Sequence, residues 1–274
     1  MIPFCVAGNP IESTLLKMLD LGGDAVLRHF ERISEEGLDY IFEAKITLVG
    51  EGGTGKTSLQ ARLLNENAAL PKDDTRTRGI QISDWHFDDS DGRKTAHIWD
   101  FGGQDVYYPV HRFFLTENSV FILLASTRNA SHNFEYWIPT IFQFGGNSPI
   151  ILGQTCHDGL RVTWNDIGNY LANTNFNIVR TGSTPYFQLN LPDRNDGLKE
   201  IRSAIVAQIA QLSHFGRGVP RSWIPVRIAI ADEAKKNACI SFDRFTEICR
   251  QINADKFADV QQVEDIGNFY ISSA

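Results

Sequence analysis

The chain has 274 residues, with 26 lysines and arginines against 33 aspartates and glutamates, and a formal net charge of −7. This acidic balance argues against a nucleic-acid-binding role, and 42% hydrophobic residues argue against a disordered chain. The four cysteines follow no metal-ligand spacing, and no apolar run approaches the roughly 20 residues that span a bilayer. Because the start lacks a basic leader, we expect a cytoplasmic globular protein with one large domain and a smaller piece and no transmembrane segment.

The first part of the chain predicts short amphipathic helices, because apolar residues recur at helical spacing before residue 42. From Lys45 onward, short β-branched apolar runs alternate with helix-like stretches. The runs cover 45–50, 79–82, 95–99, 119–125, 149–152 and 186–189, and the helical stretches cover 57–64, 134–144, 164–171 and 197–212. This alternation predicts an α/β fold with a mostly parallel six-stranded sheet that carries helices on both faces.

The alternation ends at a cluster of glycine and proline at 216–220, which indicates a domain boundary. Beyond it, 223–236 and 242–252 are predicted to be helices. We therefore expect three segments, 1–42, 43–215 and 216–274, in which short helical pieces flank a central α/β domain.

A glycine-rich loop follows the first apolar run. Residues 50–57 read Gly-Glu-Gly-Gly-Thr-Gly-Lys-Thr and fit the P-loop pattern at every fixed position, directly between a strand and a helix. Glycines let backbone N–H groups surround phosphates, Lys56 reaches the β- and γ-phosphates, and the Thr57 hydroxyl ligates Mg²⁺. The sequence therefore predicts nucleotide contacts from Gly50, Glu51, Gly52, Gly53, Thr54, Gly55, Lys56, Thr57 and Ser58.

A second motif, Asp100-Phe101-Gly102-Gly103-Gln104, lies at the end of the third run. Asp100 can hold the water shell of Mg²⁺, the N–H of Gly103 can sense a γ-phosphate, and Gln104 can orient an attacking water. Gln104 and Lys56 are thus the candidate catalytic residues. No acidic residue follows Asp100 until Asp105, which favours a GTPase over an ATPase with a neighbouring glutamate base.

The polar segment 71–80, between these two motifs, has the composition of a nucleotide-sensing switch. Thr77 is the better candidate for completing the Mg²⁺ coordination, and Thr75 is its competitor. An ordinary solvated surface loop is the alternative interpretation. The predicted metal ligands are therefore Thr57, Thr77 and Asp100.

We expect the loop after the fifth apolar run, Thr155-Cys156-His157-Asp158, to select the base of the nucleotide. The Asp158 carboxylate can accept from the ring N–H and the exocyclic amino group of guanine, a pair that adenine lacks. Common GTPases carry Asn-Lys in place of Thr155-Cys156, and Cys156 covers the base poorly, so we expect loose nucleotide affinity. A nucleophile set made of Cys156, His157 and Asp158 fails, because adjacent residues cannot align their side chains for catalysis.

With these motifs laid out, the chain resembles the Roc GTPase domain of the Roco family. The second motif, starting at Trp99, resembles the family's second switch. The segment Thr77-Arg78-Gly79-Ile80 is similar to the family's first switch. Residues 155–158 are similar to the family's Thr-His-x-Asp variant of the guanine motif. Asn190 falls where the base-contacting residue after the sixth strand lies. The resemblance implies a Ras-like P-loop GTPase fold with GTP or GDP as ligand and Mg²⁺ as cofactor.

The family also implies a larger parent protein. Residues 6–10 resemble the last turn of a leucine-rich repeat, and 220–223 resemble the start of a COR domain. On this resemblance, 1–42 is the end of a repeat and a helical linker, 43–215 the Roc domain and 216–274 the N-terminal part of COR, through which the parent forms a homodimer. Asp74 occupies the position of an arginine finger in cis, and Arg76, Arg78 and Arg112 have no assignable role.

The leading hypothesis is a small-GTPase-like switch that slowly hydrolyses GTP as part of a larger Roco signalling protein. The alternative is a nucleotide-gated scaffold or dimerisation module with negligible hydrolysis, against which Gln104 argues. An ATPase remains as a third option only if Asp158 is irrelevant to base recognition.

Overall fold

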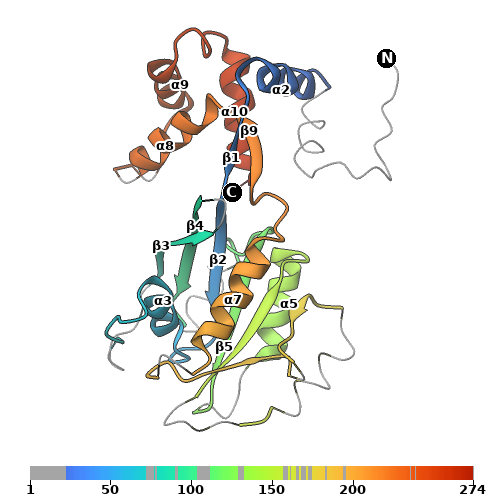
Figure 1. Ribbon diagram of the computed structural model, residues 1–274, viewed down its shortest axis with the longest axis vertical. Coiled ribbons are helices and arrows are strands. Elements are labelled where there is room, and N and C mark those ends of the chain that lie inside the picture. The colour runs from blue at the N-terminus through green and yellow to red at the C-terminus, as the bar shows by residue number, and fades with distance from the viewer. Residues whose placement is uncertain are drawn as a thin grey trace. The chain divides into compact units, whose positions relative to one another are not determined.

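The computed structural model describes residues 23–71, 77, 79–89, 92–103, 112–128, 133–156, 160, 162–164, 167, 171, 175–182, 184–193, 196–234, 236–237 and 239–273. Contacts divide the chain into two compact units (Figure 1). One is Phe42–Phe215, and the other joins Met1–Ile41 to Gly216–Ala274. No helix in the described part of the chain combines the length and the apolar character needed to cross a membrane.

The larger unit is built on a seven-stranded sheet in the order β3-β4-β2-β5-β6-β7, in which β8 also pairs with β6. Its strands are β2 (Glu43–Val49), β3 (Ile80–Asp89), β4 (Gly92–Phe101), β5 (Ser119–Ser126), β6 (Ile150–Thr155), β7 (Ile178–Val179) and β8 (Phe187–Leu189). Every pair is parallel except β3 with β4. The mostly parallel sheet is confirmed, with one strand more than expected because β7 and β8 share one edge of β6.

Helices cover both faces of this sheet, as the alternation predicts (Figure 1). α3 (Lys56–Leu64) and α7 (Leu198–Ile209) contribute to one apolar cluster, and α5 (Phe134–Gly145) contributes to the other. All eight residues of β5 are buried, because a central parallel strand is covered on both sides. The expected helix 164–171 lies mostly outside the described residues, although Trp164, Ile167 and Leu171 belong to the cluster beneath α5.

The β3–β4 hairpin is longer than the apolar runs indicate. β3 extends to Asp89, and its later residues alternate between buried Trp85 and Phe87 and exposed Asp84, His86 and Asp88. This alternation of period two is typical of an edge strand with one covered face. The apolar run indicates a strand only as far as residue 82, because polar residues interrupt the apolar ones beyond it.

The smaller unit combines the chain before the sheet with the chain after it. It contains α2 (Gly23–Glu36), β1 (Leu38–Ile41), β9 (Arg217–Pro220), α8 (Trp223–Ala234), α9 (Phe242–Ile252) and α10 (Val260–Ser273). β1 pairs antiparallel with β9, from Leu38 opposite Pro220 to Ile41 opposite Arg217. The glycine and proline cluster at 216–220, from which the domain boundary was predicted, thus contains strand β9. The partner strand, β1, lies in the predicted segment 1–42.

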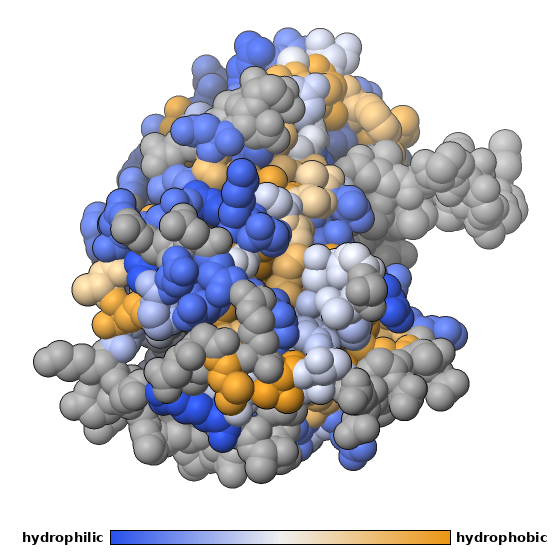
Figure 2. Space-filling model, turned by 60° about the horizontal axis from the view of Figure 1, so that its bottom comes forward, coloured by the Kyte–Doolittle hydropathy of each residue, from blue (hydrophilic) through white to orange (hydrophobic). Residues whose placement is uncertain are grey.

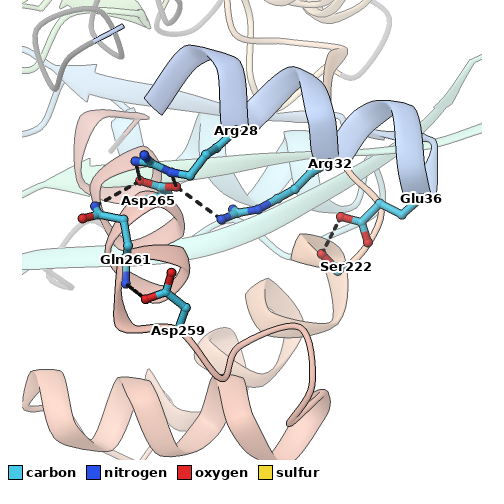
Figure 3. A network of polar contacts seen from close by, with 7 residues as sticks. All are labelled: Arg28, Arg32, Glu36, Ser222, Asp259, Gln261 and Asp265. Carbon is cyan, nitrogen blue, oxygen red and sulfur yellow. Dashed lines mark hydrogen bonds and ion pairs between the residues drawn. The ribbon is translucent and has the colours of Figure 1, made fainter. Parts of the chain in front are cut away.

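A buried carboxylate joins α2 to α10 in this smaller unit (Figure 3). Arg28 donates to Asp265 through Nε and Nη2, both at 3.0 Å, and Arg32 Nη2 donates to the same carboxylate at 3.3 Å. Asp265 is only 5% exposed, and these two guanidinium groups offset the cost of burying its side chain. Glu36, at the end of α2, accepts from the Ser222 hydroxyl at 2.9 Å and pairs with Lys256.

His29, also in α2, is buried, with its ring 5.5 Å from that of Trp223. Burial, together with the charges of Arg217 and Arg32, lowers the pKa of His29 to about 4, while the charge of Asp265 opposes the shift. The imidazole is therefore neutral in the folded unit at neutral pH.

This burial predicts acid sensitivity of the smaller unit. In the unfolded chain His29 titrates near its ordinary pKa of about 6.5, so protons bind the unfolded state first and the free energy of unfolding falls as pH drops from about 6.5 towards 4. Urea unfolding at pH 7 and pH 4.5 measures how much the free energy of unfolding falls between these two pH values. This fall should be smaller for His29→Gln than for the unchanged protein. Equal losses in both proteins would contradict this origin.

Candidate nucleotide site

The glycine-rich loop lies where the sequence places it, between the end of β2 and the start of α3. β2 ends at Val49 and α3 begins at Lys56. Gly50 has φ +132°, and a Cβ there would lie 2.2 Å from the carbonyl oxygen of Leu124 in β5. Only glycine fits at this position, because the loop turns directly over the neighbouring strand.

Lys56 is buried inside this loop, with 6% of its surface exposed. Its Nζ donates to the carbonyl oxygens of Gly50 at 2.8 Å and Glu51 at 2.7 Å. Burial lowers the pKa of Lys56 to about 8, while the charges of Asp100 and Glu51 oppose the shift. The ammonium group thus lies in a site that disfavours its charge, and a phosphate group would supply the missing counter-charge.

Three oxygen-bearing side chains meet beside Lys56. The Thr57 hydroxyl donates to Asp100 Oδ2 at 2.6 Å, the Thr77 hydroxyl donates to the same oxygen at 3.0 Å, and the two hydroxyl oxygens are 2.8 Å apart. Asp100 is fully buried, and this burial raises the pKa of its carboxyl group despite both threonines and Lys56. The structure therefore brings together the three predicted metal ligands.

These residues fit a magnesium ion. The other carboxylate oxygen of Asp100, Oδ1, is buried and has no hydrogen-bond partner among the described residues. A carboxylate and hydroxyl oxygens are ligands that Mg²⁺ accepts, and the ion usually keeps several waters. Thr75, the competitor of Thr77, lies outside the described residues, so the choice between them rests on Thr77 alone.

Gly103 lies against the loop from the side of β4. A Cβ at this position would be 2.5 Å from Lys56 Nζ and 2.6 Å from the backbone of Glu51. Two backbones therefore approach each other more closely here than any side chain permits. Gln104, the next residue and the candidate for orienting water, lies outside the described residues.

The base-side loop meets the phosphate loop at Thr155. Its hydroxyl donates to the carbonyl oxygens of Thr54 at 3.0 Å and Ala125 at 3.3 Å. Cys156 is buried, its N–H donates to Leu189 at 2.7 Å, and its Sγ points to Gln154. His157 and Asp158 lie outside the described residues, so the guanine assignment stays a prediction.

The remaining predicted residues surround this junction. Asn190 directly follows Leu189, and its backbone N–H donates to Asp196 at 3.2 Å while its carbonyl accepts from Asp193 at 2.9 Å. Ser58 is half-buried on α3, and Gly52 and Gly53 are exposed in the loop. A Cβ on Gly55 would contact the Thr155 side chain at 3.2 Å. The phosphate side and the base side are therefore adjacent.

Two polar residues in buried strands were missed by the sequence analysis. Lys45, at the start of β2, donates to the carbonyl of Phe114 at 2.9 Å and to the Thr116 hydroxyl at 3.1 Å, and burial lowers its pKa to about 8. Gln154, in β6, is fully buried. A polar residue within an apolar strand is the signal that could have identified both, because such a group must find a partner inside.

The surface of the described residues is mostly polar with scattered apolar areas. Figure 2 shows hydrophilic residues over much of the drawn face and apolar residues in a few patches. Among exposed apolar side chains, Phe113 is 81% exposed and Leu160 57%. Phe113 follows the segment that contains Gln104, and Leu160 follows Asp158 in the chain.

Comparison with known proteins shows what this chain is similar to. Residues 45–158 match the family described as "Ras of Complex, Roc, domain of DAPkinase". A probable serine/threonine-protein kinase, pats1, of Dictyostelium discoideum is 25% identical over 84% of this chain, and a Roc-COR-CHAT protease of Runella zeae is 32% identical over 44%. The chain spans 8% and 15% of the length of these relatives.

A solved structure agrees with these relatives. Methanosarcina barkeri Roco2 RocCORdC bound to GDP is 25% identical, with a TM-score of 0.63 over 85% of this chain and 68% of that one. The larger unit therefore has the Ras-like P-loop GTPase fold of a Roc domain, and the resemblance drawn from the motifs is confirmed.

The close approach at Gly103 predicts that alanine destabilises the protein more at position 103 than at position 52. Gly103→Ala places a methyl group inside contact distance of Lys56 and the loop backbone, so we expect a clearly lower melting temperature. Gly52→Ala is the matched control, because the nearest atom to its Cβ, the carbonyl oxygen of Gly103, is 3.4 Å away. Thermal unfolding of both variants without nucleotide tests this, and equal melting temperatures would contradict it.

Proposed function

We propose that this chain, whose residues 45–158 belong to the Roc domain family, is a molecular switch that binds GTP and GDP with Mg²⁺ and slowly hydrolyses GTP. The observation that carries the proposal is the meeting of Lys56 with the oxygen cluster of Thr57, Thr77 and Asp100 at one edge of the sheet. The GDP in the related Roco2 structure supports a guanine nucleotide as the ligand.

Phosphate binding follows from the buried loop. Backbone N–H groups at the start of α3 favour negative charge, and Lys56 adds the positive charge that a diphosphate or triphosphate requires. On binding, Lys56 exchanges two carbonyl acceptors for phosphate oxygens, and this stabilises its protonated form. Thr57, Thr77 and Asp100 would hold Mg²⁺, which would supply positive charge against the negative charge of the phosphates.

Hydrolysis is assigned to the segment after Gly103. Gln104 would orient the attacking water, and the N–H of Gly103 would sense the γ-phosphate. No arginine occupies the position of a finger in cis, because Asp74 stands there. Without an arginine from another protein, turnover is expected on the order of 10⁻⁴ to 10⁻² per second by comparison with related switches.

Guanine recognition is assigned to Asp158, with Thr155, Cys156, His157 and Asn190 around the base. Supporting this assignment, Thr155 is held on the phosphate loop, and Leu189, directly before Asn190, accepts the Cys156 N–H. A carboxylate that accepts two hydrogen bonds from one base discriminates strongly against a base that offers none.

The larger context is proposed from the same relatives. Residues 216–274 would be the N-terminal part of a COR domain, 43–215 would be the Roc domain, and 1–42 would be the end of a leucine-rich repeat and a helical linker. In the parent protein COR would support a homodimer, and the protein would act in the cytoplasm. The pairing of β1 with β9 supports close association of the leading and following segments.

The hydrolysis proposal predicts an effect of Gln104→Leu. Because leucine cannot orient water, single-turnover phosphate release should slow at least about tenfold while GDP affinity stays within about twofold of the unchanged protein. Equal rates would remove Gln104 from the mechanism. If the unchanged protein holds GTP for hours without releasing phosphate, the nucleotide-gated scaffold is the correct function instead.

Lys56 predicts a pH dependence of nucleotide affinity. Its pKa is about 8 in the free protein and rises when phosphate binds, so binding takes up a proton above pH 8 and GDP affinity should fall as pH rises beyond that value. Lys56→Ala should lower affinity about 100-fold and abolish this dependence. Lys45→Met, at a half-buried lysine whose pKa is also about 8, is the matched control and should keep the dependence. A pH dependence retained by Lys56→Ala would contradict the assignment.

A further inference from the structure

Arg62 is a buried charged residue that neither phosphate binding nor hydrolysis explains. It lies in the last turn of α3 and is only 7% exposed. Burying a charge is costly unless hydrogen bonds compensate for the lost water, so such a group and its acceptors fix one another in place. The acceptors of the Arg62 guanidinium therefore show which parts of the chain depend on it.

Two of these acceptors lie just beyond α3. Arg62 Nη1 donates to the carbonyl oxygens of Glu66 at 2.6 Å and Ala68 at 3.0 Å. Both residues follow the end of the helix at Leu64. Because the guanidinium is planar and rigid, these two bonds also fix the direction in which its Nε–H points.

The third acceptor is distant in the sequence. Arg62 Nε donates to the carbonyl oxygen of Leu191 at 3.0 Å, and both residues are buried. Leu191 lies two residues beyond the end of β8 and directly follows Asn190. Arg62 thus joins the helix that carries Lys56 and Thr57 at its start to the chain beside a proposed base contact.

The side chain of Leu191 lies against the phosphate loop as well. A Cβ on Gly55 would be 3.1 Å from Leu191 Cδ1 and 3.2 Å from Thr155 Cγ2, so both side chains pack over this glycine. On the other side of Asn190, Leu189 pairs with Thr155 in β6. Asn190 therefore lies between two anchored neighbours, one fixed to β6 and the other fixed to α3 and the phosphate loop.

The backbone of Asn190 makes two hydrogen bonds of its own. Its N–H donates to the carbonyl of Asp196 at 3.2 Å, and its carbonyl accepts from the N–H of Asp193 at 2.9 Å. An amide hydrogen exchanges slowly with solvent only while its hydrogen bond is formed. The N–H groups of Asn190 and Asp193 therefore report whether this part of the chain is held in place.

We propose that Arg62 is a positioning residue for base recognition, which holds Asn190 through the Leu191 carbonyl and so links the base side of the nucleotide to the helix that binds its phosphates. The proposal rests on the proposed function, in which Asn190 contacts the base. The bonds of Lys56 to the loop carbonyls and of Thr57 to its carboxylate partner do not involve Arg62. Phosphate binding should therefore survive a change at position 62.

The test compares GDP with inorganic pyrophosphate, which carries two phosphates but no base. Affinities are measured with Mg²⁺, by competition against a fluorescent GDP analogue, for the unchanged protein and Arg62→Lys. Lysine keeps the positive charge, but one ammonium group does not reproduce donors that the guanidinium directs separately to Leu191 and to the chain after α3. We expect GDP affinity to fall about tenfold and pyrophosphate affinity to stay within about twofold.

Arg202→Met is the matched control. Arg202, in α7, pairs with the Glu66 carboxylate at 2.7 Å, so it contacts the same segment after α3 but does not contribute to the bond between Arg62 and Leu191. We expect this variant to keep the unchanged ratio of GDP to pyrophosphate affinity. A ratio lowered as much as in Arg62→Lys would overturn the inference, because loosening of the segment after α3 would then be the cause.

The outcomes separate this inference from the proposed function. If the unchanged protein binds GDP more tightly than pyrophosphate and Arg62→Lys keeps that ratio, the inference is overturned and the proposed function stands. An equal loss for both ligands also overturns it, because a residue that only stabilises α3 would behave in that way. If the unchanged protein binds GDP no more tightly than pyrophosphate, base recognition itself fails.

A measurement on the unchanged protein guards against a failure of Arg62→Lys to fold. Because Arg62 and its acceptors all belong to the chain, we expect them to hold Asn190 before a nucleotide binds. In nucleotide-free protein, the N–H groups of Asn190 and Asp193 should exchange with deuterium at least about tenfold more slowly than in an unfolded peptide, and at least about threefold faster in folded Arg62→Lys. Unprotected exchange of both groups in the unchanged protein would overturn the proposal.

Discussion

The parallel pairing of β2 with both β4 and β5 determines where every part of the site lies. In register, Leu48 is opposite Asp100 on one side and Ile122 on the other. The carboxyl ends of parallel strands meet at one edge of a sheet, so the phosphate loop, Asp100 and the carbonyl of Leu124 come together there. The contact that requires glycine at position 50 is a direct consequence, as is the approach of Gly103 to Lys56.

Burial of two charged groups then favours the binding of charged ligands at this edge of the sheet. Lys56 and Asp100 are both removed from water, so the pKa of the lysine is lowered and that of the aspartate is raised. Each group is held by neutral partners, backbone carbonyls for Lys56 and threonine hydroxyls for Asp100. A ligand that brings phosphate oxygens and a divalent cation satisfies both at once. Thr155 joins β6 to this centre, and Gln154 in the same strand bonds the carbonyl and the N–H of Val162.

Local patterns in the sequence predicted much of this arrangement. The glycine-rich loop and the alternation of apolar runs identified the parallel sheet, both helical layers and the meeting of Thr57 with Asp100, because these depend on short-range chemistry. The pairing of β1 with β9 was missed, since its strands are separated by the whole larger unit and one of them contains glycine and proline. The hydrogen-bond partners of Gln154 and Lys45 were also missed. A buried polar residue indicates that a partner exists, but the sequence does not show which residue it is. Gln104 and Asp158 stay predictions from their motifs.

We infer that this site binds a guanine nucleotide through Lys56 and the oxygen cluster around Asp100. The most direct measurement is calorimetric titration of nucleotide-free protein with GDP and with ADP, each in the presence of Mg²⁺. The account predicts one GDP per chain and ADP binding at least about 100-fold weaker, because only guanine offers the paired donors that a carboxylate accepts. Equal or tighter binding of ADP, or binding of neither nucleotide, would contradict it.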